Sequence, residues 1–303
     1  MSCVVPPSVA GERGLNASGY IAREGSLSRI SPAFRPAVDD AGRRIAHSFR
    51  HLLPGAYLRG AYLYGSVPRG TAEPGRSDLD ILLVLRSEPT DADRAEAGRI
   101  EAALAARHRA IDGAGIVLLS ARRVLSPAER YDLGFFVACL CTPLSGEDLA
   151  PLLPWYRPTR ELARETSGDL RLFLDRWRRR AGSGGGLDRL GREVSRKTVR
   201  TGFTLVMPRW NGWTSDLDVS ADVFGRYYPE RAGQMREAVT LARMPAGPAG
   251  GRSVCRGRSV CRGLSVPPGP APGRDGLRLL LDDLGPWLAG EYEREIGVKT
   301  PRK

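Results

Sequence analysis

Cysteine and histidine are scarce in this chain of 303 residues, which contains five Cys and three His. Five irregularly spaced cysteines are too few for a disulfide framework, and Cys139 and Cys141 lie in the apolar run LGFFVACLC, where buried free thiols are expected. His47 and His51 share one helix face but lack a third metal ligand, so surface or packing roles are expected for them. These shortages argue against a disulfide-stapled domain and against a zinc enzyme.

Long apolar runs are also missing. No stretch approaches the roughly 20 apolar residues that cross a bilayer, and the N-terminus lacks a basic flank followed by an apolar core. We therefore expect a cytoplasmic protein with no membrane partner. The length exceeds what one small core usually organises, and a hydrophobic content of 42% is sufficient for two domains.

Lysine is the third scarce residue: three of the 46 basic residues are Lys and the rest are Arg. Residues 1–150 contain 18 Arg and 17 acidic residues, a net charge of +1, so +11 of the formal +12 belongs to residues 151–303. Two interpretations stay open. Abundant Arg, Ala, Gly and Pro can reflect a compositionally biased genome, and a local cationic excess can steer ATP or polyanions toward a cleft.

The strongest motif is the run LYGSVPRGTAEPGRSDLDILLVL at residues 63–85. Asp78 and Asp80 are two residues apart, so on a strand both carboxylates project from the same face. The apolar run from Ile81 to Leu85 predicts that this strand is buried on both faces. Two neighbouring anions repel unless a cation neutralises them, and oxygen ligands suit Mg²⁺ that carries substrate phosphates. The motif therefore predicts a magnesium site.

A glycine-serine turn precedes the two carboxylates. Residues 61–64 are predicted to form a short strand, and Gly65 and Ser66 form the turn after it. Glycine lets the backbone approach a phosphate, the serine hydroxyl can donate to it, and a helix that starts here favours an anion. Arg69 adds a guanidinium on the same segment. The turn is therefore a predicted phosphate-binding element beside the metal site.

This arrangement resembles the signature of the DNA polymerase β nucleotidyltransferase superfamily, in which G-S, an R-G pair and D-x-D follow one another. The matching residues, in order, are Gly65, Ser66, Arg69, Gly70, Ser77, Asp78 and Asp80. The resemblance implies that the two aspartates hold catalytic metal ions. It implies that the nucleotide is bound by Gly65, Ser66, Arg69 and Ser77.

The superfamily also uses a third carboxylate on a neighbouring strand, to bind a second metal or to accept the proton of the attacking hydroxyl. The next predicted strand is residues 116–119, and the acidic residue near its start is Asp112. Asp112 has two interpretations, a third catalytic and metal-binding carboxylate or a turn residue close to two glycines. With the second interpretation, catalysis itself comes into question.

The predicted fold class is α+β, with a mixed-sheet nucleotidyltransferase core followed by an all-α helical bundle. We expect a loose N-terminal segment at 1–35, the nucleotidyltransferase domain at 36–126 and a helical domain at 127–244. A Pro/Gly-rich linker with a tandem GRSVCR repeat is expected at 245–275, and a C-terminal helix at 276–303. Within these domains, helices are predicted at 36–53, 90–108, 127–140, 159–181, 187–207, 216–226 and 229–243, with a loop at 143–154.

The predicted helix at 187–207 carries Arg192, Arg196 and Arg200 on one face. A solvated basic face is one interpretation; the other is that Arg200 reaches the nucleotide phosphates. Residues 198–242 resemble the helical domain of streptomycin/spectinomycin-type adenylyltransferases, which supports the second. Where those enzymes place a phosphate-contacting lysine, this chain has residues 214–216 of sequence TSD, a departure from the family pattern.

The sequence therefore predicts a metal-dependent nucleotidyltransferase that uses Mg²⁺ and transfers AMP from ATP to a hydroxyl of a small molecule such as an aminoglycoside, an antibiotic-resistance activity. The charge of residues 151–303 argues mildly against a cationic acceptor. Two alternatives are nucleotidyl transfer to nucleic acid or protein, and a non-catalytic, antitoxin-like nucleotide-binding partner.

Overall fold

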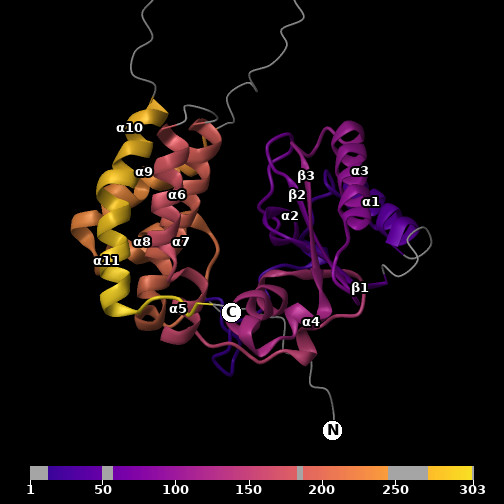
Figure 1. The fold of residues 1–303 in the computed structure, drawn as a ribbon, viewed down its shortest axis with the longest axis horizontal. Helices are drawn as coiled ribbons and strands as arrows, with labels where there is room; N and C mark the ends of the chain where they lie inside the picture. The colour runs from indigo at the N-terminus through magenta and orange to yellow at the C-terminus, as the bar shows by residue number, and fades with distance from the viewer. Residues whose placement is uncertain (1–12, 50–56, 183–186, 245–271, 302–303) are drawn as a thin grey trace, which may run out of the picture. The chain divides into compact units, whose positions relative to one another are not determined.

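A computed structural model describes residues 13–49, 57–182, 187–244 and 272–301 of the chain (Figure 1). His51, the GRSVCR repeat, Cys3 and most of the predicted linker lie outside the described residues. The chain divides into two compact units. The first contains the described residues up to Thr166 together with Asn211–Thr214, and the second contains Ser167–Trp210 and Ser215–Thr300.

The first unit is built on a mixed sheet of β1 (Leu58–Tyr64), β2 (Leu79–Leu85), β3 (Ala114–Ser120) and β4 (Thr142–Gly146). The strand order is β3-β2-β1-β4. Strand β1 is antiparallel to both neighbours, whereas β2 and β3 are parallel. Both predicted core strands, 61–64 and 116–119, lie inside longer observed strands.

The alternation of apolar residues along β2 fills two separate cores. Ile81 and Leu83 face one core together with Ile45 of α1 (Arg35–His47) and Leu104 of α3 (Asp91–Arg107). Leu82 and Val84 face the other, and every residue from Ile81 to Leu85 is buried. Figure 1 shows α1 and α3 beside the sheet. A strand covered on both faces is what the unbroken apolar run predicts.

Helix α3 begins with a capping box, in which Thr90 and Asp93 satisfy each other's backbone N–H groups. It matches the predicted helix at 90–108 closely. Helix α1 begins one residue before the predicted position and ends at His47. Ser48 and Phe49 continue in a π-helical turn, and the predicted end at residue 53 falls outside the described residues.

Residues 127–166 belong to the first unit, where we expected the helical domain to begin at residue 127. The predicted helix at 127–140 is a 3₁₀ turn, Pro127–Glu129, followed by two π-helical turns, Arg130–Gly134 and Phe136–Leu140. Its residue Val137, with Cys141 and Leu149, packs against Tyr62 and Leu82. This shared apolar core ties residues 137–149 to the sheet, and the division between the units falls later, between Thr166 and Ser167. Cys139 and Cys141 are buried free thiols, as predicted.

The predicted loop at 143–154 was wrong in its first part, because β4 runs through it and pairs with β1. Strand β4 lies at the edge of the sheet, where Pro143 is tolerated since its missing N–H leaves few ladder bonds unmade. The short polar sequence around it carries no apolar alternation, so the strand gave no signal.

The N-terminal residues 13–34 are packed, where we expected a loose segment up to residue 35. Leu15 and Ile21 form an isolated bridge, and a 3₁₀ turn covers Leu27–Arg29. Ile30 and Phe34 are buried in the same core as α1 and α3. Apolar residues without periodicity can therefore anchor an irregular segment, which the sequence pattern did not indicate.

The described residues of the second unit form helices and no strand, so the predicted fold class is confirmed. Its helices are α6 (Leu170–Gly182), α7 (Leu187–Trp210), α8 (Leu217–Tyr227), α9 (Ala232–Ala242), α10 (Pro272–Leu279) and α11 (Gly285–Glu295). A π-helical turn, Leu280–Leu284, joins the last two. Trp177, Phe203, Phe224 and Tyr292 are among its fully buried side chains.

The predicted helix at 159–181 is two helices, α5 (Arg160–Ser167) and α6. The break falls at Gly168 and Asp169, and Asp169 accepts a hydrogen bond of 2.7 Å from Lys197 Nζ. Glycine and aspartate are both poor residues for a helix interior.

Among the helices of the described part of the chain, none combines the length and apolar character needed to span a membrane.

Candidate active site

The pairing of β1 with β2 brings the two predicted motifs together. Tyr64, the last residue of β1, lies opposite Asp80 in the antiparallel register. The glycine-serine turn follows Tyr64 directly, so it begins beside the Asp80 carboxylate although Gly65 and Asp80 are fifteen positions apart in the sequence. The sheet register therefore places the glycine-serine turn beside the Asp80 carboxylate.

Gly65 is required by both its backbone and its surroundings. Its φ of 80° and ψ of −152° lie in a region that only glycine adopts readily. A Cβ placed on it would clash with Asp80 Oδ2. The main chain thus passes against the carboxylate with no side chain between them.

The turn continues as the single helical turn α2 (Ser66–Arg69) and closes at Gly70, which has a left-handed φ of 76°. Arg69 Nε donates a hydrogen bond of 2.9 Å to the carbonyl of Gly65. This bond ties the guanidinium to the start of the turn and fixes the stem of Arg69. Ser66 is half-buried at the head of the turn.

The two carboxylates lie over the start of β3. Asp78 is exposed and Asp80 is half-buried. A Cβ placed on Gly113 would be 3.1 Å from Asp78 Oδ1, and one placed on Gly115 would be 3.9 Å from Asp80 Oδ1. Gly113 and Gly115 are two residues apart, as the aspartates are, so all four positions share one face of the sheet.

Tyr64 lies on the same face as Asp80. Burial, with the negative charge of Asp80 as the next contribution, raises the pKa of Tyr64 far above its usual range. The ring makes an edge contact with Phe136, with the ring centroids 5.0 Å apart. Tyr64 is therefore a neutral, fixed wall of the site, and sequence reasoning did not single it out.

Ser77 closes the loop that leads to the carboxylates. Its Oγ accepts a hydrogen bond of 2.9 Å from the backbone N–H of Glu73. Its carbonyl accepts one of 3.1 Å from the N–H of Asp112. The structure thus gives Ser77 a role in loop geometry, and its predicted contact with nucleotide stays a prediction.

Asp112 is exposed in the turn before β3. Among the residues that the structure describes, no three Asp, Glu, His or Cys side chains form a group that could hold a metal ion. Asp112 lies in the turn that precedes β3, which begins two residues later at Ala114. Its role as a third catalytic and metal-binding carboxylate stays a prediction.

Arg200 belongs to α7 in the second unit and is exposed on the helix, as is Arg196. Its assignment to the nucleotide phosphates stays a prediction.

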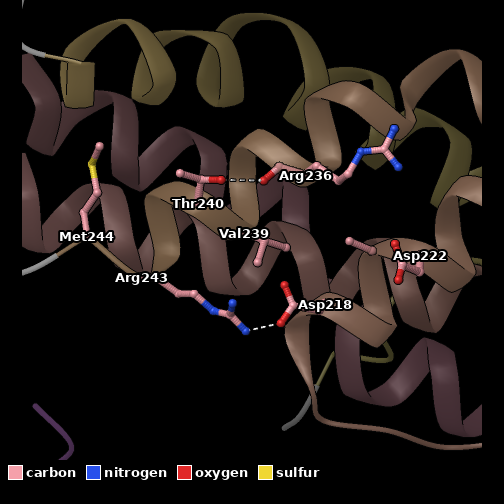
Figure 2. Close-up of a pocket in the computed structure, with 8 residues that line it drawn as sticks. Asp218, Asp222, Arg236, Val239, Thr240, Arg243 and Met244 are labelled. Atoms are coloured by element: carbon pink, nitrogen blue, oxygen red, sulfur yellow. Dashed lines mark hydrogen bonds and ion pairs between the residues drawn. The ribbon is translucent and has the colours of Figure 1, made fainter. Parts of the chain in front are cut away.

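A pocket of about 490 Å³ also lies in the second unit, between α8 and α9 (Figure 2). Its lining includes the ion pair of Asp218 with Arg243, and none of the predicted site residues.

The family model described as "Nucleotidyltransferase domain" matches residues 43–112. The matched segment contains the glycine-serine turn, Asp78 and Asp80, so the predicted resemblance to the nucleotidyltransferases is confirmed for this segment. The matched segment also contains β1, α2, β2 and α3 of the first unit.

Among solved structures, the chain is similar to the spectinomycin adenyltransferase AAD(9) from Enterococcus faecialis, crystallised with ATP and spectinomycin. The identity is 14% and the TM-score 0.47, with 84% of this chain and 98% of the other chain covered. No curated protein matches the chain significantly.

Proposed function

We propose that this protein is a metal-dependent nucleotidyltransferase that transfers AMP from ATP to a hydroxyl of a small-molecule acceptor such as an aminoglycoside. The acceptor oxygen attacks the α-phosphorus, the bond between that phosphorus and the bridging oxygen of the β-phosphate breaks, and pyrophosphate leaves. The observation that carries the proposal is the contact of the Asp80 carboxylate with the Gly65 main chain, inside a matched nucleotidyltransferase domain.

The glycine-serine turn would bind the outer phosphates. At Gly65 the bare main chain can approach a phosphate oxygen, and Ser66 can donate its hydroxyl proton. Arg69 would assist through its guanidinium, whose Nε is already oriented by the carbonyl of Gly65. Ser77 and Arg200 are proposed to contribute further nucleotide contacts.

The donor set of Asp78 and Asp80 fits Mg²⁺, because it consists of carboxylate oxygens that share one face. Mg²⁺ bound there would neutralise phosphate charge and lower the pKa of the attacking hydroxyl. Asp78 and Asp80 would hold the nucleotide's triphosphate in place through the positive charge of the bound Mg²⁺. The turn at Gly65 would orient the triphosphate. Catalysis then rests mainly on positioning and electrostatics.

Two observations favour other candidates. The net charge of +11 in residues 151–303 favours an anionic acceptor, as in nucleotidyl transfer to nucleic acid. The position of Asp112, outside any group of three metal ligands among the described residues, favours a binder that retains nucleotide without turnover.

The test is Mg²⁺-dependent pyrophosphate release from each NTP, with and without a panel of aminoglycosides and spectinomycin. Asp80→Asn keeps the shape of the side chain and removes its charge, so we expect at least a hundredfold loss of acceptor-dependent release, by analogy with the loss of one preorganised electrostatic group. Asp91→Asn is the matched control, because Asp91 is fully exposed at the start of α3.

Release that requires an acceptor and is lost in Asp80→Asn alone would support the proposal. Release with an RNA or protein acceptor only would move the acceptor class to macromolecules. Nucleotide binding without release under any condition would leave the non-catalytic candidate.

A further inference from the structure

Two glycines face the paired carboxylates: Gly113, directly before β3, and Gly115, within it. The parallel register sets Asp80 opposite Gly115 and Leu79 opposite Ala114, so Asp78 lies opposite Gly113. The backbone N–H of Leu79 donates to the carbonyl of Gly113 at 2.9 Å, which fixes this register up to the edge of the site. A third carboxylate on β3 would have to come from one of these two positions.

Neither glycine is demanded by its backbone. Gly113 and Gly115 are absent from the positive φ angles of the chain, so a side chain at either position would carry no left-handed strain. The nearest atom to a Cβ on Gly113 is the free end of the exposed Asp78 side chain, which can move by a few tenths of an ångström. A Cβ at either position would therefore have only the Asp78 or the Asp80 carboxylate as a neighbour within 4 Å.

Two carboxylates supply few of the six oxygen ligands that Mg²⁺ requires. Among the described residues, no third Asp, Glu, His or Cys completes a group with them. A pair of cations about 4 Å apart, the usual two-metal spacing, repels strongly unless further carboxylates bridge it. The phosphates of a nucleotide supply both the missing oxygens and the missing negative charge.

We infer that this site binds a single divalent cation, that the cation binds together with the nucleotide, and that Gly113 sets this stoichiometry by keeping a third carboxylate out. The inference rests on the proposed nucleotide binding at Gly65 and Asp80. The acceptor hydroxyl then meets a site with no protein carboxylate from β3 to take its proton, and that proton passes to solvent water.

The test uses Mn²⁺ as the probe, counted by electron paramagnetic resonance after equilibrium dialysis of the full chain. The dialysis is run without nucleotide and with a non-hydrolysable ATP analogue. For the natural chain we expect weak retention of Mn²⁺ alone, and about one Mn²⁺ per bound nucleotide with the analogue. Two Mn²⁺ per bound nucleotide would overturn the inference and leave the proposed function intact. Absence of nucleotide binding would instead overturn the proposed function.

The variant Gly113→Glu adds the missing carboxylate. We expect it to tighten Mn²⁺ binding without nucleotide by about tenfold or more, the scale by which ligand charge tunes metal affinity, and to raise retention with the analogue toward two. Gly98→Glu is the matched control, because no atom lies within 4 Å of a Cβ placed on that exposed residue of α3. Equal effects of the two variants would contradict a role for Gly113, and a circular dichroism spectrum of each reports whether it folds.

Discussion

The contact between Gly65 and Asp80 makes a quantitative prediction for Gly65→Ala. The variant carries two costs. A non-glycine residue in this region of φ and ψ costs about 1–3 kcal/mol. The added Cβ also clashes with Asp80 Oδ2, and displacing a half-buried carboxylate adds about 1 kcal/mol through lost packing and rotamer strain. We expect a total of about 2–4 kcal/mol from these terms.

Gly75→Ala separates the two costs. Gly75 also has a positive φ, of 75°, but the nearest atom to a Cβ there is a carbonyl oxygen at 3.9 Å. This variant therefore carries backbone strain alone, about 1 kcal/mol. Hydrogen exchange of peptides that cover β1 and β2 measures both, because it reports the local free energy of opening within the first unit.

A double-mutant cycle isolates the clash. In an Asp80→Ala background the carboxylate is gone, so Gly65→Ala should cost about 1 kcal/mol less than in the natural chain. The reasoning is refuted if Gly65→Ala costs no more than Gly75→Ala, or if its cost is the same with and without the Asp80 side chain.

Two further predictions concern the first unit. Tyr62 is fully buried; its hydroxyl donates to the Glu147 carbonyl at 2.9 Å and accepts from the Leu149 N–H at 2.8 Å. Tyr62→Phe should therefore lower the free energy of unfolding of the first unit by about 2–3 kcal/mol, measured by urea unfolding. A loss below about 0.5 kcal/mol would contradict this assignment. The pKa of Asp40 is raised by burial, but hydrogen bonds to His108 and Arg44 outweigh this and lower it overall from 3.8. Because the folded-state pKa is lowered, the Asp40 carboxylate stabilises the fold above the pKa of the unfolded state, and this stability is lost as the pH falls through the folded-state pKa. Asp40→Asn should therefore destabilise the fold at pH 7 and weaken the decline of stability below about pH 4. Thermal unfolding from pH 2 to 8 measures both effects.

Much of the site was predictable because its two halves are encoded locally. Gly65 and Ser66 mark a turn, and the alternation of Asp78 and Asp80 with apolar neighbours marks one face of a buried strand. What local pattern does not encode is register. The pairing of Tyr64 with Asp80 and of Asp80 with Gly115 depends on which strands become neighbours in the sheet. For that reason the glycines of β3 were noted only as neighbours of Asp112.

The limits of the domain prediction have a similar cause. Residues 127–140 have helical spacing, so the sequence indicated the start of a helical domain, but their apolar side chains pack on the sheet through Tyr62 and Leu82. Helical periodicity identifies an apolar face and not the surface that covers it. Strand β4 was missed because an edge strand of five residues that includes a proline carries neither alternation nor high β-propensity.

Glycine residues flank the paired carboxylates of the candidate site on both sides. Gly65 exposes the main chain on the side of β1, and Gly113 and Gly115 expose it on the side of β3. A site that held its metal permanently would gain affinity from side-chain ligands at those positions. With glycine at these positions, main chain and not a side chain faces an anion that approaches the carboxylates, and a cation between the anion and the carboxylates would offset the repulsion. This arrangement supports the proposal that the cation and the nucleotide bind as one unit, and the expectation that a carboxylate added at Gly113 uncouples them.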